Sequence, residues 1–165
     1  MRVAILSDLH DNYILWHEKV LPELKKRQVE AMIFLGDMCS PGVAGKVAEE
    51  FALPIHLIWG NVDGDKPMST QKLAQFEQVK IYGNEGEINF DNRRIFFTHY
   101  PDRAREIAAT GSYDLVAHGH THQAYQEQVN KTLLINPGTV GGLFFASSFM
   151  IYNTKDNKSE LIKPN

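Results

Sequence analysis

VAILSDLH, residues 3–10, places two potential metal ligands, Asp8 and His10, within four residues of the end of a run of four apolar residues. A short run rich in Val and Ile that ends at polar residues predicts a buried β-strand. The pattern returns in IFLGD (33–37) and LIWGN (57–61), where an apolar run is followed by glycine and then aspartate or asparagine. Each of the first three predicted strands therefore carries a potential metal ligand just past its end.

Amphipathic segments separate these three strands. A helix is predicted over residues 12–27, and Pro22 should kink or split it because proline cannot donate to the preceding turn. Val43, Val47 and Phe51 recur at four-residue spacing, which predicts a second helix. Alternating strands and helices (βαβαβ) imply a parallel sheet with right-handed crossovers.

The second half of the chain is richer in predicted strands. They are expected at residues 79–82, 87–90, 95–98, 115–117, 125–129, 132–135, 144–152 and, as an edge, 160–162. A helix is predicted over residues 101–109. Mixed strands with helices at both ends of the pattern predict an α/β fold of two packed mixed sheets flanked by helices. Neither a repeat nor a linker-like change in composition interrupts the chain, so we expect a single domain over residues 1–165.

Composition limits the class of protein. Apolar residues make up 43% and charged residues 22% of the chain, as in an ordinary globular domain. The formal net charge of −3 argues against a long nucleic acid as partner, because such partners need a basic surface. The single cysteine, Cys39, excludes an internal disulfide and fits a reducing compartment. The apolar stretch 143–152 is too short to span a membrane, so a cytoplasmic protein without a membrane partner is expected.

Two further predicted strands also end in potential ligands. FFTH (96–99) ends at His99, and LVAHGHTH (115–122) ends in two spaced histidines. Sites in open α/β sheets lie outside the carboxyl ends of the strands. One cluster is therefore expected from seven side chains: Asp8, His10, Asp37, Asn61, His99, His120 and His122. Each fragment alone is a weak signal, since a strand-end aspartate is often a helix cap or turn residue, but five strand ends in order are specific.

The ligand types indicate which metal such a cluster would hold. Imidazole nitrogen with carboxylate and amide oxygen, and without thiolate, suits Mn, Fe, Zn, Ni or Co rather than a structural zinc or a calcium site. Seven ligands are too many for one tetrahedral ion, whereas two ions sharing one carboxylate would use them all. Two ions about 3.5–4 Å apart can share a hydroxide, because their charge lowers the pKa of bound water toward neutrality. Two divalent ions per chain are expected, with manganese preferred.

The order Asp-x-His, Gly-Asp, Gly-Asn, His, Gly-His-x-His resembles the calcineurin-like metallophosphoesterase superfamily, and the short chain resembles its small single-domain phosphodiesterase branch. The resemblance implies a four-layer αββα sandwich. It also implies hydrolysis of small phosphodiesters by a metal-bridging hydroxide that attacks phosphorus in line. It implies one ion bound by Asp8, His10, Asp37 and His122. It implies a second ion bound by Asp37, Asn61, His99 and His120, so that Asp37 is the bridge. The expected catalytic residues are Asp37, Asn61 and His10.

Some positions depart from the superfamily pattern. Many members have histidine after the Gly-Asn pair, where it can protonate the leaving oxygen, but this chain has Val62. Weak activity on monoesters with poor leaving groups is therefore expected. Asp63 could partly substitute for the missing acid or orient a neighbouring residue, but the preferred interpretation is a turn residue before Gly64. Tyr100 stands where glycine commonly follows the ligand histidine, and it could line the pocket, stack on a substrate ring or pack against the sheet.

Two other functional classes compete with the enzyme. A retromer subunit in the same branch is a non-catalytic interaction scaffold with a degraded metal site, yet here all seven expected ligands are present. A flavodoxin-like binding module would explain the βαβ start but leaves residues 119–122, Gly-His-Thr-His, unexplained. A homo-oligomer is compatible with the sequence.

Overall fold

The computed structural model describes residues 1–164; Asn165, the last residue of the expected domain, lies outside them. One sheet contains β1 (Arg2–Leu6), β2 (Ala31–Phe34), β3 (Ile55–Leu57), β4 (Val79–Ile81), β10 (Phe149–Asn153) and β11 (Lys158–Ile162). The other contains β5 (Glu85–Phe90), β6 (Arg93–Thr98), β7 (Leu115–Ala117), β8 (Tyr125–Val129) and β9 (Thr132–Asn136). Their strand orders are β11-β10-β1-β2-β3-β4 and β5-β6-β7-β9-β8.

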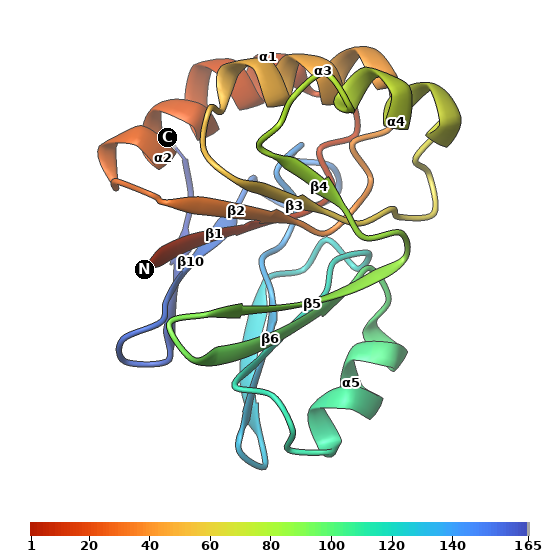
Figure 1. Ribbon diagram of the computed structural model, residues 1–165. Coiled ribbons are helices and arrows are strands. Elements are labelled where there is room, and N and C mark those ends of the chain that lie inside the picture. The colour runs from red at the N-terminus through yellow and green to blue at the C-terminus, as the bar shows by residue number, and fades with distance from the viewer. Residues whose placement is uncertain (165) are drawn as a thin grey trace.

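Helices cover the outer face of each sheet (Figure 1). The first sheet is covered by α1 (Tyr13–Leu15), the π-helical turn η1 (Trp16–Val20), α2 (Leu21–Lys26), α3 (Pro41–Glu50) and α4 (Lys66–Leu73). The second sheet is covered by α5 (Pro101–Ala109). The layers are therefore helix, sheet, sheet and helix, which confirms the predicted αββα sandwich.

Alternation along the strands builds three apolar layers. On β1, Ala4 and Leu6 pack against the helices, while Val3 and Ile5 face the second sheet. On β6, Phe97 faces inward and Phe96 packs under α5. Because side chains alternate with a period of two, a strand between two layers must be apolar on both faces. Each fully buried aliphatic side chain contributes about 1.5–3 kcal/mol.

Strand direction decides where the functional loops meet. β1, β2 and β3 pair in parallel, as the βαβαβ pattern predicts. In the second sheet β6, β7 and β9 also pair in parallel. The carboxyl ends of neighbouring parallel strands lie at one edge of a sheet, so the loops that follow them can form one site.

Two predicted elements differ from the structure. The helix predicted over residues 12–27 contains the π-helical turn, in which the Leu21 N–H bonds to the Trp16 carbonyl. Pro22, in the first turn of α2, has no N–H to continue a regular ladder, which explains the wider turn before it. The strand predicted at 144–152 is wrong in its first part, because β10 begins at Phe149. Positive φ at Phe144 (66°) breaks the extended backbone there. Within residues 1–164, none of the helices has the length and apolar character of a membrane span.

Candidate metal centre

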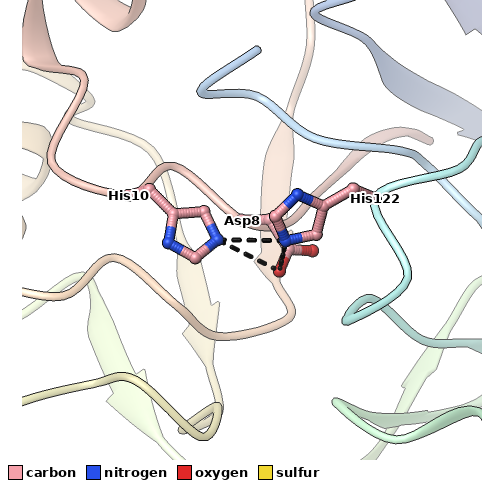
Figure 2. A group of neighbouring side chains, drawn as sticks. All are labelled: Asp8, His10 and His122. Atoms are coloured by element: carbon pink, nitrogen blue, oxygen red, sulfur yellow. Dashed lines mark hydrogen bonds and ion pairs between the residues drawn. The ribbon is translucent and has the colours of Figure 1, made fainter. Parts of the chain in front are cut away.

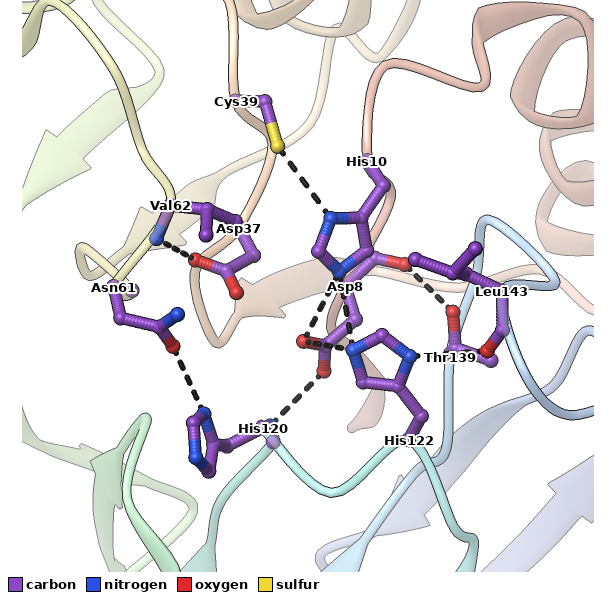
Figure 3. A network of polar contacts seen from close by, with 12 residues as sticks. Asp8, His10, Asp37, Cys39, Asn61, Val62, His120, His122, Thr139 and Leu143 are labelled. Atoms are coloured by element: carbon purple, nitrogen blue, oxygen red, sulfur yellow. Dashed lines mark hydrogen bonds and ion pairs between the residues drawn. The ribbon is translucent and has the colours of Figure 1, made fainter.

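The seven predicted side chains lie on five loops at the carboxyl ends of β1, β2, β3, β6 and β7. The structure brings them into two adjoining groups. The Asp8 cluster contains Asp8, His10 and His122. The Asp37 cluster contains Asp37, Asn61, His99 and His120. Figure 3 shows most of these side chains converging from loops that are distant in the sequence.

In the Asp8 cluster, three ligand atoms face one another (Figure 2). His10 Nε2 and His122 Nε2 are 3.1 Å apart, and Asp8 Oδ1 lies 3.2 Å from the His122 atom and 3.7 Å from the His10 atom. The two ring nitrogens can share at most one proton. Asp8 is fully buried, and among residues 1–164 its Oδ1 has no hydrogen-bond partner. An unpaired buried polar group costs about 1–3 kcal/mol, so these donor atoms fit a divalent cation, which would satisfy all three.

The Asp37 cluster is linked by hydrogen bonds of its own. Asn61 Oδ1 lies 2.9 Å from His99 Nε2 and 2.8 Å from His120 Nδ1. Asp37 Oδ2 lies 3.3 Å from the same His99 nitrogen, and Asp37 Oδ1 accepts the Val62 N–H at 2.9 Å. Carboxylate oxygen, amide oxygen and two imidazole nitrogens form a donor set that suits a transition metal.

The two clusters adjoin through their carboxylates. Asp8, Asp37 and His99 each offer an atom within 4.8 Å of the others, so Asp8 belongs to both groups of convergent donors. The second oxygen of Asp8 accepts the His120 backbone N–H at 3.1 Å. The geometry thus places two carboxylates at the junction, whereas the sequence resemblance assigns the shared position to Asp37 alone.

Backbone carbonyls orient two of the ligand histidines. His99 Nδ1 lies 2.7 Å from the Leu35 carbonyl, and His122 Nδ1 lies 3.0 Å from the Leu143 carbonyl. Because a carbonyl only accepts, Nδ1 carries the proton in both rings and Nε2 is directed into the site. His10 Nδ1 contacts Cys39 Sγ at 3.6 Å. Burial raises the pKa of the Cys39 thiol to about 12, which keeps it neutral.

Carboxylates and imidazoles in the site shift one another's pKa values toward the charged forms. Burial acts to raise the pKa of Asp37, but the bond and charge of His99 outweigh it and leave this pKa below its ordinary value. Burial acts to lower the pKa of His99, and Asp37 raises it overall. The Asp8 carboxylate, 3.7 Å from His10 Nε2, raises the pKa of His10. Protons on imidazoles beside carboxylates occupy positions that a metal ion takes when it binds, with release of those protons.

Backbone strain is concentrated at the same residues. Five of the seven have left-handed φ angles: Asp8 (57°), His10 (47°), Asp37 (61°), His120 (71°) and His122 (59°). A sparsely populated backbone conformation costs on the order of 1–3 kcal/mol per residue and persists where the surroundings enforce it. Such residues cluster at functional sites, which supports the assignment made from geometry.

Asp63 holds two of the ligand loops together. Its Oδ2 accepts the N–H groups of Asp37 (2.9 Å) and Gly60 (2.6 Å), and its Oδ1 accepts that of Cys39 (3.0 Å). The preferred interpretation of Asp63 as a turn residue missed this role. Only the bond from Gly60 is local; Asp37 and Cys39 lie 26 and 24 residues away, so a short-range sequence pattern gives no sign of the link between the loops.

The segment 137–141 supports the loop after β1. Thr139 Oγ1 donates to the Asp8 carbonyl at 2.8 Å, and the Gly141 N–H donates to the same oxygen at 2.9 Å. Gly119 is also required here, because a Cβ at this position would overlap Ser7 Oγ and Asp8 Oδ2. His118, in contrast, points to Tyr125 Oη at 2.6 Å, and its burial lowers its pKa to about 4. His118 is therefore not among the convergent donors.

The comparisons with known proteins agree with this geometry. The model of the calcineurin-like phosphoesterase superfamily domain matches residues 1–157. The chain belongs to this superfamily. The phosphodiesterase MJ0936 of Methanocaldococcus jannaschii is 31% identical over 151 residues, which cover 86% of each protein.

Two solved structures share the fold. An archaeal phosphodiesterase superposes with a TM-score of 0.89 at 26% identity, covering 98% of this chain and 99% of that one. Zinc-complexed Vps29 of Entamoeba histolytica superposes with a TM-score of 0.67 at 15% identity, covering 98% of each chain. At that identity the second likeness shows the fold alone.

Proposed function

We propose that this protein is a phosphodiesterase that hydrolyses small phosphodiesters with two bound divalent metal ions. The observation that carries the proposal is the buried Asp8 Oδ1, which is unpaired within residues 1–164 and faces two imidazole nitrogens. An unpaired carboxylate oxygen between two histidines has a physical reason if a cation belongs there. The M. jannaschii relative, named as a phosphodiesterase, supports the choice of diesters.

Each cluster is proposed to hold one ion. The Asp8 cluster binds the first and the Asp37 cluster binds the second, with Asp37 as the shared ligand. Manganese is our first choice, because the donors are imidazole, carboxylate and amide; nickel, iron, zinc and cobalt remain alternatives. No thiolate is among the proposed ligands, because the half-buried Cys39 places its Sγ 3.6 Å from His10 Nδ1, the ring nitrogen that is turned away from Asp8.

When bound, two such ions polarise a phosphoryl oxygen and lower the pKa of a water toward neutrality. The residues of the chain position the reactants around that chemistry. Asn61 presents its Oδ1 to the two histidines, which leaves its Nδ2 group available to donate to a phosphate oxygen. His10 has one nitrogen toward Asp8 and the other at Cys39, so it is better placed as a ligand than as a proton donor.

Three further features of the protein are part of the proposal: its domain organisation, its location in the cell and the size of its substrate. A single domain, a cytoplasmic location and small diesters rather than long nucleic acids rest on the unbroken composition, the lone cysteine and the net charge of −3. A scaffold without catalysis would have no need of an enforced, strained ligand cluster, which favours the enzyme over that alternative.

The test is a panel of phosphate mono- and diesters assayed after chelation and again with Mn, Ni, Co, Zn or Mg. Diester hydrolysis should disappear on chelation and return with Mn or a neighbouring transition metal. His122→Ala should lower the rate of diester hydrolysis, whereas His17→Ala, which removes a surface histidine paired with Glu50, should not. Undiminished hydrolysis by protein shown to be metal-free by elemental analysis would overturn the proposal.

A further inference from the structure

Two exposed aromatic residues flank the metal centre, one beside each cluster. Tyr100 is 41% exposed and Phe144 is 83% exposed. Single exposed apolar residues are common on protein surfaces. These two, however, each lie against a ligand histidine, so their position beside the clusters needs an explanation.

Phe144 lies beside the Asp8 cluster at an energetic cost. Its ring centroid is 5.4 Å from that of His122, and the preceding carbonyl, of Leu143, accepts the His122 Nδ1 hydrogen bond. Phe144 has a φ of 66°, a conformation that is a genuine outlier for a bulky residue. Folding thus leaves a large apolar ring in solvent, in a strained conformation, directly beside a metal ligand. Backbone strain of this kind clusters at active sites and ligand-binding sites.

Tyr100 lies beside the Asp37 cluster. Its ring packs at 5.3 Å from His99, nearly perpendicular (87°), and at 5.6 Å from His120. It precedes Pro101 and has extended backbone angles (φ −98°, ψ 132°), as a residue before proline must. The side chain contacts the ligand histidines, and part of its surface stays open. Of the three roles expected for Tyr100, this position fits lining the site and stacking on a substrate, because the ring packs on His99 and His120.

We infer that Tyr100 and Phe144 are specificity-determining residues that stack on planar aromatic groups carried by the two arms of the diester. The inference rests on the proposed function, because it places the phosphate between the clusters. A phosphate there leaves its two ester oxygens directed away from the ions, one toward each side of the site. An aryl or nucleobase ring can stack on an exposed aromatic face, whereas a small alkyl arm cannot.

The experiment compares bis(4-nitrophenyl) phosphate, which has two rings, with methyl 4-nitrophenyl phosphate, which has one. The Mn-loaded protein is assayed as wild type and as Phe144→Asn, Tyr100→Leu and Tyr100→Phe. Phe144→Asn and Tyr100→Leu should each raise KM for the two-ring diester by roughly three- to tenfold, with kcat little changed, as for a loss of uniform binding. Only one of these two substitutions should raise KM for the one-ring diester, because its single ring can stack on only one of the two side chains. Tyr100→Phe should keep the wild-type KM.

The controls separate stacking from structure. Phe145→Ala removes a neighbouring ring, 46% exposed, from the same loop and should leave both KM values unchanged. Phe144→Asn should not lower the melting temperature, because asparagine tolerates positive φ. Bound metal per chain should stay at the wild-type value in every variant.

The stacking inference alone is overturned if the wild type hydrolyses both diesters and all variants show the same KM as the wild type. Wild type that hydrolyses neither diester with any metal overturns the proposed function and the inference with it. Loss of metal from Tyr100→Leu would assign Tyr100 to holding the histidines and contradict stacking.

Discussion

The Asp37 cluster and the Asp8 cluster contain similar ligand types, but the chain supports them differently. In the Asp37 cluster, the Asn61 amide oxygen contacts two histidines and the carboxylate of Asp37 is bonded to backbone and ring. In the Asp8 cluster, two ring nitrogens face each other beside a carboxylate oxygen without a partner within residues 1–164. Hydrogen bonds therefore organise the Asp37 cluster in advance, whereas the donor atoms of the Asp8 cluster would be satisfied by the proposed cation.

The largest effect is expected from Asp37→Ala. Asp37 is the proposed ligand of both ions, so its loss should reduce kcat/KM by roughly a thousandfold or more, as when a central charge-stabilising group is removed. Bound metal should fall toward one ion or none per chain. His122→Ala, which affects the Asp8 cluster alone, should keep one ion. Metal analysis that finds two tightly bound ions in Asp37→Ala would show that Asp37 is not the bridge, and Asp8 would be the next candidate.

Asp63→Ala should affect the Asp37 cluster next most strongly. It leaves three backbone N–H groups without their carboxylate. The free energy of unfolding should fall by roughly 3 kcal/mol or more, since bonds to charged groups contribute about 1.5–3 kcal/mol each. Asp65→Ala is the matched control, because it removes only a helix cap that accepts the Met68 N–H, worth about 1 kcal/mol. Equal losses in a denaturant titration would contradict the role given to Asp63.

Metal binding should raise stability through the Asp8 cluster in particular. At a hundredfold excess over the dissociation constant, one ion stabilises the folded state by about 2.7 kcal/mol. Thermal unfolding with and without saturating Mn measures the effect, which should be smaller in His10→Ala than in wild type. An unchanged melting temperature in wild type would be inconsistent with the cluster described here.

The smallest effect is expected from Val62→His. The Val62 side chain is 45% exposed while its N–H bonds to Asp37, so histidine can replace it without disturbing the core. A positioned general acid contributes about 10²–10⁴-fold, but this ring would lack a partner selected to orient it, and we expect about tenfold or less. The gain should be greatest for monoesters with poor leaving groups. Identical dependence of rate on leaving-group pKa in both proteins would assign proton donation to another group.

The sequence alone was sufficient to predict strands and candidate ligands that are specified by neighbouring residues. The run before Asp8 and the Gly-His-x-His segment combine strand pattern and ligand chemistry within a few residues, and parallel strands bring such ends together. The layers and the two sheets followed from the same patterns.

The interactions that sequence did not predict are distant in the chain. The hydrogen bonds that Asp63 accepts from Asp37 and Cys39 depend on how two loops approach after folding. The run around Phe144 has the apolar composition of a strand, but positive φ angles at Gly142 and Phe144 make it a loop beside His122. Apolar composition cannot distinguish a buried strand from a loop whose ring is held at a site.

The most direct test is an anomalous diffraction map, recorded at the manganese absorption edge, from crystals of the Mn-loaded protein. The account predicts two peaks per chain. One should lie among Asp8, His10 and His122, and the other among Asp37, Asn61, His99 and His120. A single peak, or peaks away from these side chains, would contradict the two-ion centre.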